Sequence, residues 1–260
     1  MNQIQITHPN GKIENYTAPR AWNELTAKQL VAWSHICLQK IDLNDAKKQL
    51  VKLFYHIPKK TFRYLKIGQI LQIADTLNFL SEKNECSKWP IKSFRCGFKR
   101  YYGPGDSFSN LTIAEYRCAE LYYQSYIRSQ NKCALVFLMA TLYRTKRKGK
   151  VTDDIREEFN EHLVLKRFKR FSKLSDQLLQ ACLLNYEGCR NHLIDKYARA
   201  FTKTDSSQTS NEIFDLEEVI EAFAGDKFGS FNETEKTNLH RFFRYLVHSI
   251  EQSETQSKQA

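Results

Sequence analysis

The sequence predicts a mainly α-helical fold: a multi-helix bundle with an N-terminal β-hairpin and a small β insertion near residues 91–102. Apolar residues fill 42% of the 260 positions, which is enough to form a sizeable core. Glycine and proline, with 9 and 5 copies, are too scarce for the many turns of an all-β fold. Apolar side chains also recur at helical spacing along much of the chain, so helices should dominate.

The chain starts with the pattern of a β-hairpin. Two short strand-like runs, 4–7 and 12–16, flank a turn that contains Asn10-Gly11. Asn-Gly is a favoured turn pair because both residues tolerate positive φ. Pro19 is expected to end the second strand.

Three helices should follow the hairpin, because apolar residues recur on one face of each segment. The first begins with a capping box, Thr26-x-x-Gln29, in which the hydroxyl accepts from the Gln29 amide and the Gln29 side chain reaches back. The three helices are predicted near 27–40, 44–57 and 67–82. Beyond them, Phe94, Cys96 and Phe98 alternate with polar residues, which predicts the short β insertion.

Helical patterns return at Thr112, where Thr112-x-x-Glu115 forms a second capping box. The segment from Lys132 to Tyr143 is apolar around most of its circumference, as in the central helix of a bundle. Ser175 is expected to begin a further helix that reaches about Phe201, and Gly188 could bend or divide it.

A helix over 153–170 is predicted to begin at Thr152. Its first turn would hold the acidic pairs Asp153-Asp154 and Glu157-Glu158. Carboxylates at that place complement the positive end of the helix dipole, so these pairs need no catalytic explanation.

One segment has the composition of a linker. Residues 202–212 contain no apolar side chain. The sequence therefore predicts a helical domain over 1–201, which includes the hairpin, and a C-terminal helical pair over 213–251. The pair would consist of an amphipathic stretch at 213–224 and a helix near 233–251, followed by a disordered polar tail over 252–260.

Common catalytic and cofactor-binding motifs are missing from the sequence. No histidine belongs to an H-E-x-x-H motif or pairs with cysteine at zinc-finger spacing. Gly103-Pro104-Gly105 is glycine-rich, but Pro104 lacks the backbone donor that a phosphate-binding loop needs. We therefore expect no enzymatic activity, no cofactor and no metal; an enzyme with a site dispersed along the chain is the alternative.

The expected environment is a reducing cytoplasm. The seven cysteines are odd in number and scattered, and none forms a C-x-x-C pair, which favours free thiols. No apolar run approaches the roughly 18 residues that span a bilayer. The N-terminus also lacks the basic and apolar regions of a secretory signal, so a soluble protein without membrane contact is expected.

Positive charge is concentrated in two stretches. The net charge is +11; residues 144–170 contribute ten Lys or Arg against five Asp or Glu, and residues 85–110 contribute five against two. Flexible basic loops neutralise phosphates, and interleaved aromatic residues can stack on unpaired bases. Alternatively, Phe168 and Phe171 point into the core while the neighbouring charges face water. The candidate contacts for nucleic acid or an acidic partner are Arg144, Lys146, Arg147, Lys148, Lys150, Lys166, Arg167, Lys169 and Arg170.

Four motifs follow one another in order along most of the chain. They are Ala18-Pro19-Arg20-Ala21-Trp22-Asn23-Glu24-Leu25-Thr26 with Gln29; Tyr102-Gly103-Pro104-Gly105-Asp106 leading to Asn110-Leu111-Thr112-Ile113-Ala114-Glu115-Tyr116; Met139-Ala140-Thr141-Leu142-Tyr143-Arg144; and Ala222-Phe223-Ala224-Gly225-Asp226-Lys227-Phe228-Gly229. Together they resemble a family of phage and prophage proteins of Bacteroidetes-type hosts. Members of that family lie among tail and virion assembly genes, and some are labelled tail assembly chaperones.

The resemblance implies a non-enzymatic role in virion assembly, with other phage structural or assembly proteins as partners. It places the protein in the cytoplasm of a bacterial host or in the virion, and it supplies no catalytic residues. The charge of +11 departs from what a plain chaperone would carry. A nucleic-acid-binding protein that uses the stretches 144–150 and 166–170 is therefore the alternative hypothesis.

Overall fold

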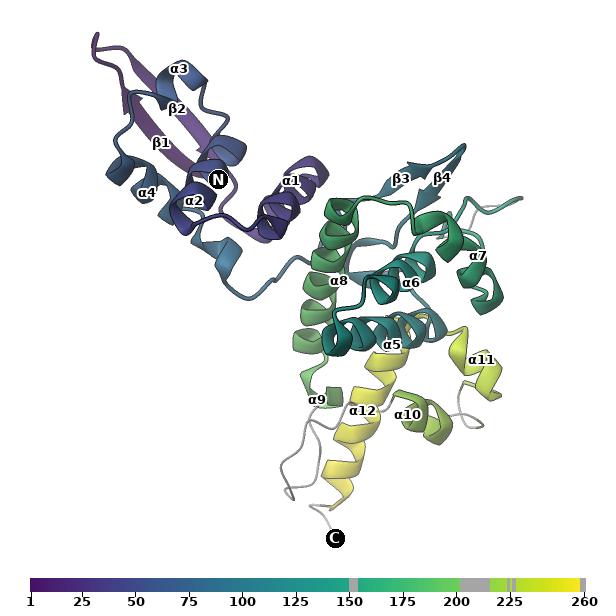
Figure 1. Ribbon diagram of the computed structural model, residues 1–260. Coiled ribbons are helices and arrows are strands. Elements are labelled where there is room, and N and C mark those ends of the chain that lie inside the picture. Colours follow the sequence, from purple (N-terminus) through teal and green to yellow (C-terminus); the bar gives the residue numbers. More distant parts are fainter. Residues whose placement is uncertain (150–153, 202–215, 224, 226–227, 258–260) are drawn as a thin grey trace. The chain divides into compact units, whose positions relative to one another are not determined.

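A computed structural model describes residues 1–149, 154–201, 216–223, 225 and 228–257 (Figure 1). It confirms the predicted fold class: the protein is mainly α-helical and carries two small antiparallel sheets, one of them an N-terminal hairpin. No helix in this part of the chain combines the length and apolar character that crossing a membrane requires.

The chain forms two compact units, and this division differs from the predicted one. Unit 1 contains residues 1–91 and 175–188, and unit 2 contains residues 92–174 and 189–260. The expected single domain over 1–201 is thus divided. The C-terminal helices belong to unit 2 because they pack against α5 (Ile113–Ser129) and α9 (Ala198–Phe201). The predicted linker, 202–212, lies outside the described residues.

Unit 1 starts with the predicted hairpin, in which Ile4 lies opposite Tyr16. Its second strand ends at Ala18, directly before Pro19, as expected. The Thr26 capping box is present, and α2 packs against α1, α4 and the second strand. The elements of unit 1 are β1 (Asn2–Thr7), β2 (Ile13–Ala18), η1 (Trp22–Glu24), α1 (Ala27–Leu38), α2 (Leu43–Tyr55), α3 (Lys59–Phe62), α4 (Ile67–Asp75) and η2 (Asn78–Ser81).

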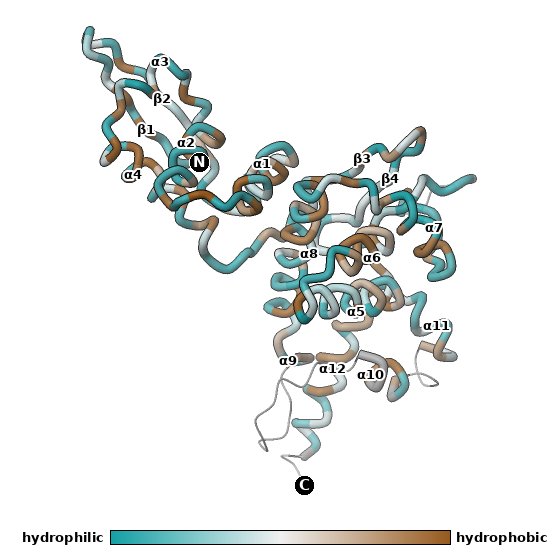
Figure 2. The backbone as a smooth tube through the Cα atoms, in the orientation of Figure 1, coloured by the Kyte–Doolittle hydropathy of each residue, from teal (hydrophilic) through white to brown (hydrophobic). Residues whose placement is uncertain are grey.

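Unit 2 is built around α6, as its apolar composition predicted. This helix packs against α5 and α7, and Figure 2 shows it as a largely hydrophobic segment. The β insertion is present as β3 (Ser93–Cys96) and β4 (Lys99–Tyr102). The helical elements are η3 (Asp106–Phe108), α5 (Ile113–Ser129), α6 (Lys132–Leu142), α7 (Glu161–Phe171), α8 (Asp176–Lys196, shared with unit 1), α9 (Ala198–Phe201), α10 (Leu216–Phe223), α11 (Phe231–Glu235) and α12 (Leu239–Ser257).

The prediction of a helix over 153–170 is wrong at its start. Residues 154–160 are not helical, and α7 begins only after Asn160, whose side chain accepts a hydrogen bond from the His162 amide at 2.9 Å. Residues 155–157 instead pair with 145–147 through backbone hydrogen bonds. The proposed cap, Thr152, lies outside the described residues.

The prediction of a disordered tail from residue 252 is wrong for the residues that the structure describes there. Helix α12 continues through Ser257. Within it, the hydroxyl groups of Ser253 and Thr255 donate to carbonyl oxygens four residues earlier, at 3.1 and 2.8 Å. These short polar side chains therefore bond back to the helix that carries them.

Gly188 does not divide its helix, because α8 runs through it. A Cβ atom at this position would lie 2.7 Å from the carbonyl oxygen of Cys86 and 2.6 Å from Asn84 Oδ1. The Asn84 amide also donates to the Leu184 carbonyl at 2.6 Å, so the segment 84–86 packs closely on the helix. The missing side chain is what permits this approach.

Replacing Gly188 should therefore destabilise unit 1. We expect Gly188→Ala to lower the free energy of unfolding by roughly 1–3 kcal/mol, the usual cost of overpacking. Gly68→Ala is the matched control: it also lies in a helix, but nothing lies within 4 Å of an added Cβ, so it should stabilise by up to about 1 kcal/mol. Urea denaturation of both variants measures the difference; equal effects would contradict the packing argument.

Glu14 makes the stability of the β1–β2 hairpin depend on pH. A hydrogen bond from Lys12 at 2.8 Å, with others from Tyr16 and His8, lowers the pKa of Glu14 from 4.5 to about 2. Because the folded-state pKa is the lower one, this stabilisation is present above about pH 4.5 and is lost as the pH falls towards 2. Carboxyl chemical shifts measured by NMR should show the low pKa, and Lys12→Met should raise it; an unchanged pKa in that variant would contradict the assignment.

Candidate functional site

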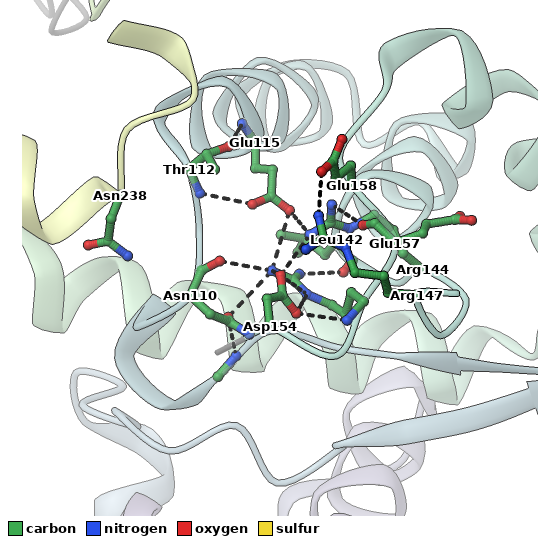
Figure 3. Close-up of polar contacts among 12 residues, drawn as sticks. Asn110, Thr112, Glu115, Leu142, Arg144, Arg147, Asp154, Glu157, Glu158 and Asn238 are labelled. Atoms are coloured by element: carbon green, nitrogen blue, oxygen red, sulfur yellow. Dashed lines mark hydrogen bonds and ion pairs between the residues drawn. The ribbon is translucent and has the colours of Figure 1, made fainter. Parts of the chain in front are cut away.

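A pocket of about 750 Å³ opens in unit 2 where the first turns of α5 and α7 meet α11. Five of the residues that line it belong to a cluster of three arginines and three carboxylates that come from distant parts of the sequence. Figure 3 shows Glu115, Arg144, Asp154 and Glu157 of this cluster. We call these six residues the charge cluster: Glu115, Arg144, Asp154, Arg156, Glu157 and Arg167.

Glu115 is placed by the predicted capping box at the start of α5. Its Oε2 atom accepts from the Thr112 amide at 2.8 Å, and its own amide donates to the Thr112 hydroxyl at 3.3 Å. The other carboxylate oxygen, Oε1, faces the guanidinium groups of Arg144 and Arg156. The side chain is only 1% exposed, so one carboxylate both caps a helix and holds two buried cations.

Arg144 follows α6 and is held at both its backbone and its side chain. Its backbone pairs with that of Tyr102 in β4, through hydrogen bonds of 2.8 and 3.1 Å. Its Nη1 atom donates to the Glu157 carbonyl at 2.6 Å, and its Nη2 atom lies 3.3 Å from Asp154 Oδ2. Burial lowers the pKa of Arg144 to about 10, against the opposing effect of Glu115, so the side chain is charged at neutral pH.

Arg156 is fully buried and forms a bidentate pair with Asp154. Its Nε atom donates to Asp154 Oδ1 at 3.0 Å, and its Nη2 atom donates to Asp154 Oδ2 at 2.8 Å. Its Nη1 atom donates to the carbonyl oxygen of Leu142 at 2.9 Å, and Nη2 donates to that of Asn110 at 3.2 Å. One side chain thus ties the end of α6 to the loop before α5.

Arg167, on α7, completes the cluster. Its Nε atom donates to the Ala140 carbonyl at 2.6 Å, and its Nη1 atom contacts Glu157 Oε1 at 3.0 Å. Burial lowers the pKa of Arg167 from its usual value, an effect that Glu157 opposes. The Glu157 carboxylate also accepts from the Thr145 hydroxyl at 2.7 Å.

The arrangement shows what the cluster does for the fold. The last carbonyl groups of a helix have no partner within it, and cations at that end are favourable. In α6 the carbonyl groups of Ala140 and Leu142 accept from Arg167 and Arg156. The charges of the three positive and three negative side chains cancel. Each guanidinium group donates hydrogen bonds to carboxylate and main-chain oxygens. The cluster therefore closes the end of α6 and fixes the segment 154–157.

Two of the sequence-predicted contact residues cannot serve as external contacts. Arg144 and Arg167 are 2% and 4% exposed, because both were drawn into the charge cluster. Arg147 is half-buried and pairs with Glu158. Lys150 lies outside the described residues. The candidates that remain exposed are Lys146, Lys148, Lys166, Lys169 and Arg170.

Sequence reasoning missed Arg156, and it assigned Asp154 and Glu157 to the first turn of a helix. No local signal indicated this outcome, because Arg156 donates to the carbonyl oxygens of Leu142 and Asn110, which lie 14 and 46 positions earlier in the chain. The described residues contain no group of three or more His, Cys, Asp or Glu side chains arranged to hold a metal ion. All seven cysteines are free thiols.

Comparison with known proteins does not identify a family. No protein-family model, no curated protein and no solved structure matches this chain.

Proposed function

We propose that this protein has a non-catalytic role in the assembly of a phage or prophage virion and acts through contacts with other proteins. The observation that carries the proposal is that two residues of the charge cluster, Glu115 and Arg144, lie in two of the four motifs. Glu115 ends the helix-capping part of the second motif, and Arg144 is the last residue of the third. In the structure these two residues form a buried ion pair. The motifs are thereby explained by the fold, and no reactive group is needed to account for them.

The fourth motif also has a structural purpose. Phe223 packs edge-on against Phe242 of α12, with ring centres 6.0 Å apart, and Phe228 lies 5.1 Å from the ring of Tyr245. These aromatic contacts join α10 and the loop after it to α12. The residues that carry the family resemblance therefore stabilise the fold. This is consistent with a protein that acts through contacts on its surface.

Unit 1 offers a surface suited to a protein partner. Leu38, Ile41 and Leu43 are all exposed at the junction of α1 and α2. Neighbouring exposed apolar side chains mark sites of protein contact more often than isolated ones do. Such a surface is consistent with a partner that is itself a virion component.

Affinity capture tests this proposal. Tagged protein is recovered from cells after phage induction, and mass spectrometry identifies its partners. We expect tail or other virion proteins, and we expect Leu38→Ser/Leu43→Ser to recover less of them than wild type does. Leu121→Ser, which changes an exposed leucine on α5, is the matched control. Recovery without any virion protein, or equal recovery in the double variant, would argue against the proposal.

A further inference from the structure

A strongly basic surface lies on unit 2, on the β3–β4 hairpin and the second half of α7. Figure 1 labels these elements. We call it the hairpin–α7 surface. Residues 92–105 and 162–175 contain no Asp or Glu at all. The exposed cations of this surface are Arg95, Lys99, Arg100, Lys166, Lys169, Arg170 and Lys173.

Buried contacts fix the hairpin on the helix. The Phe171 ring lies edge-on to Tyr101 with centres 4.7 Å apart, and it lies 5.2 Å from Phe94. Arg170 Nη1 donates to the Tyr101 hydroxyl at 3.1 Å, and the Cys96 thiol donates to the Arg170 carbonyl at 3.5 Å. The cations are therefore carried by a preformed surface.

Between hairpin and helix lies an open pocket of about 360 Å³. Four of its seven lining residues carry positive charge and none carries negative charge. These four are Lys99, Lys169, Arg170 and Lys173.

Basic residues in the last turn of a helix offset its dipole, which accounts for the charges on α7. The helix dipole does not account for the positive charges on the hairpin, where Arg95 and Arg100 lie directly opposite each other. Like charges in that position destabilise a strand pair.

Phe98 adds an apolar flat face to this basic surface. It sits in the two-residue turn Gly97–Phe98, where Gly97 takes a φ of 59°, as the primed hairpin turns require. The ring is fully exposed to solvent, so it contributes nothing to the core. Proteins hold unpaired bases by combining a basic groove for the phosphates with aromatic rings on which the bases stack, and an exposed ring beside a basic pocket offers both.

We propose that the hairpin–α7 surface binds single-stranded nucleic acid, with backbone phosphates at the basic pocket and a base stacked on Phe98. The charge of the surface is complementary to a phosphate backbone. A duplex keeps its bases stacked inside, so it has no free base face for Phe98, and an acidic polypeptide has few flat faces to offer. The inference uses a surface different from the one in unit 1 and is independent of the assembly role.

Binding of fluorescein-labelled dT20 and U20 to the full chain tests the proposal, with a 20-base-pair duplex in a third arm. Fluorescence anisotropy at 50–300 mM salt gives the affinities. For three to five phosphate contacts, the slope of log affinity against log salt should be about −2 to −3.5. Whichever of the two single strands binds tighter shows whether DNA or RNA is preferred.

Two kinds of variant separate the ring from the charges. Phe98→Ala should weaken binding of the single strand roughly 5- to 100-fold and leave the salt slope unchanged. Lys99→Glu/Lys173→Glu should weaken binding and flatten the slope. Lys59→Glu/Lys60→Glu reverses two charges of exposed α3 residues in unit 1 and should retain the wild-type affinity.

Several outcomes would overturn the proposal. The first is that no strand binds at 50 mM salt, and the second is that the α3 control loses as much affinity as Lys99→Glu/Lys173→Glu. The third is that the duplex binds more tightly than the single strands and Phe98→Ala has no effect. The fourth is that polyglutamate displaces the labelled strand as well as an unlabelled single strand does. The last outcome would assign the surface to an acidic protein partner. Circular dichroism confirms that each variant is folded before its affinity is compared.

Discussion

Glu115→Gln should lower the free energy of unfolding by about 3–5 kcal/mol, the usual cost of leaving buried charges without their partner. The substitution removes one negative charge while Arg144 and Arg156 remain buried around it. Glutamine keeps an acceptor for the Thr112 amide, since Glu and Gln serve equally in a capping box. The loss therefore measures the charge and not the helix cap. Urea denaturation at pH 7 gives the change.

Glu158→Gln is the matched control for this experiment. Glu158 pairs with Arg147, but its side chain is 85% exposed. Exposed ion pairs contribute about 0–1 kcal/mol, so this variant should unfold close to wild type. Adding Arg144→Met to Glu115→Gln should restore part of the lost stability, because it removes one of the two buried cations that residue 115 no longer neutralises. A loss below about 1 kcal/mol for Glu115→Gln would contradict the stabilising role given to the charge cluster.

Phe171→Ala should cost about 3–5 kcal/mol, as is usual when a large buried aromatic side chain is truncated. Its ring is fully buried and contacts both Phe94 and Tyr101, so the cavity would lie between α7 and the hairpin. Amide hydrogen exchange should therefore accelerate in β3 and β4 more than in α2 of unit 1. Thermal denaturation and exchange measured by mass spectrometry provide the two readouts.

Phe98→Ala is the corresponding control on the same hairpin. It removes the same side chain from a fully exposed position, so stability should change by no more than about 0.5 kcal/mol. If Phe171→Ala were equally mild, the hairpin would not depend on α7 for its position. The basic pocket between hairpin and helix would then lack the rigidity ascribed to it.

Local signals in the sequence predicted most elements of the fold. Both capping boxes, at Thr26 and Thr112, form as expected, because their hydrogen bonds join residues only three positions apart. The apolar run at 132–143 also predicted a buried central helix, since α6 is apolar on nearly every face. The β insertion followed from the alternation around Phe94.

The charge cluster could not be predicted, because it depends on contacts between residues far apart in sequence. Asp154 and Glu157 favour a helix start by local preference, but pairing with Arg156, Arg167 and the 145–147 backbone holds them in extended segments. The sequence likewise suggested that Arg144 was an exposed basic residue, because its partners lie far from it in the chain. Its partner Glu115 lies 29 positions earlier, and no local pattern connects the two.

Unit 1 is made of two separate segments of the chain, so it can finish folding only late in synthesis on the ribosome. The unit needs residues 175–188 as well as 1–91, and it includes hydrogen bonds from Asn84 to Leu184 and from Asn185 to Lys88. At typical elongation rates the ribosome takes on the order of 5–20 s to make the residues between Ile91 and Gly188. For that interval the nascent N-terminal segment has emerged without its last helix, and the residues of unit 2 up to Leu174 are made before unit 1 can close.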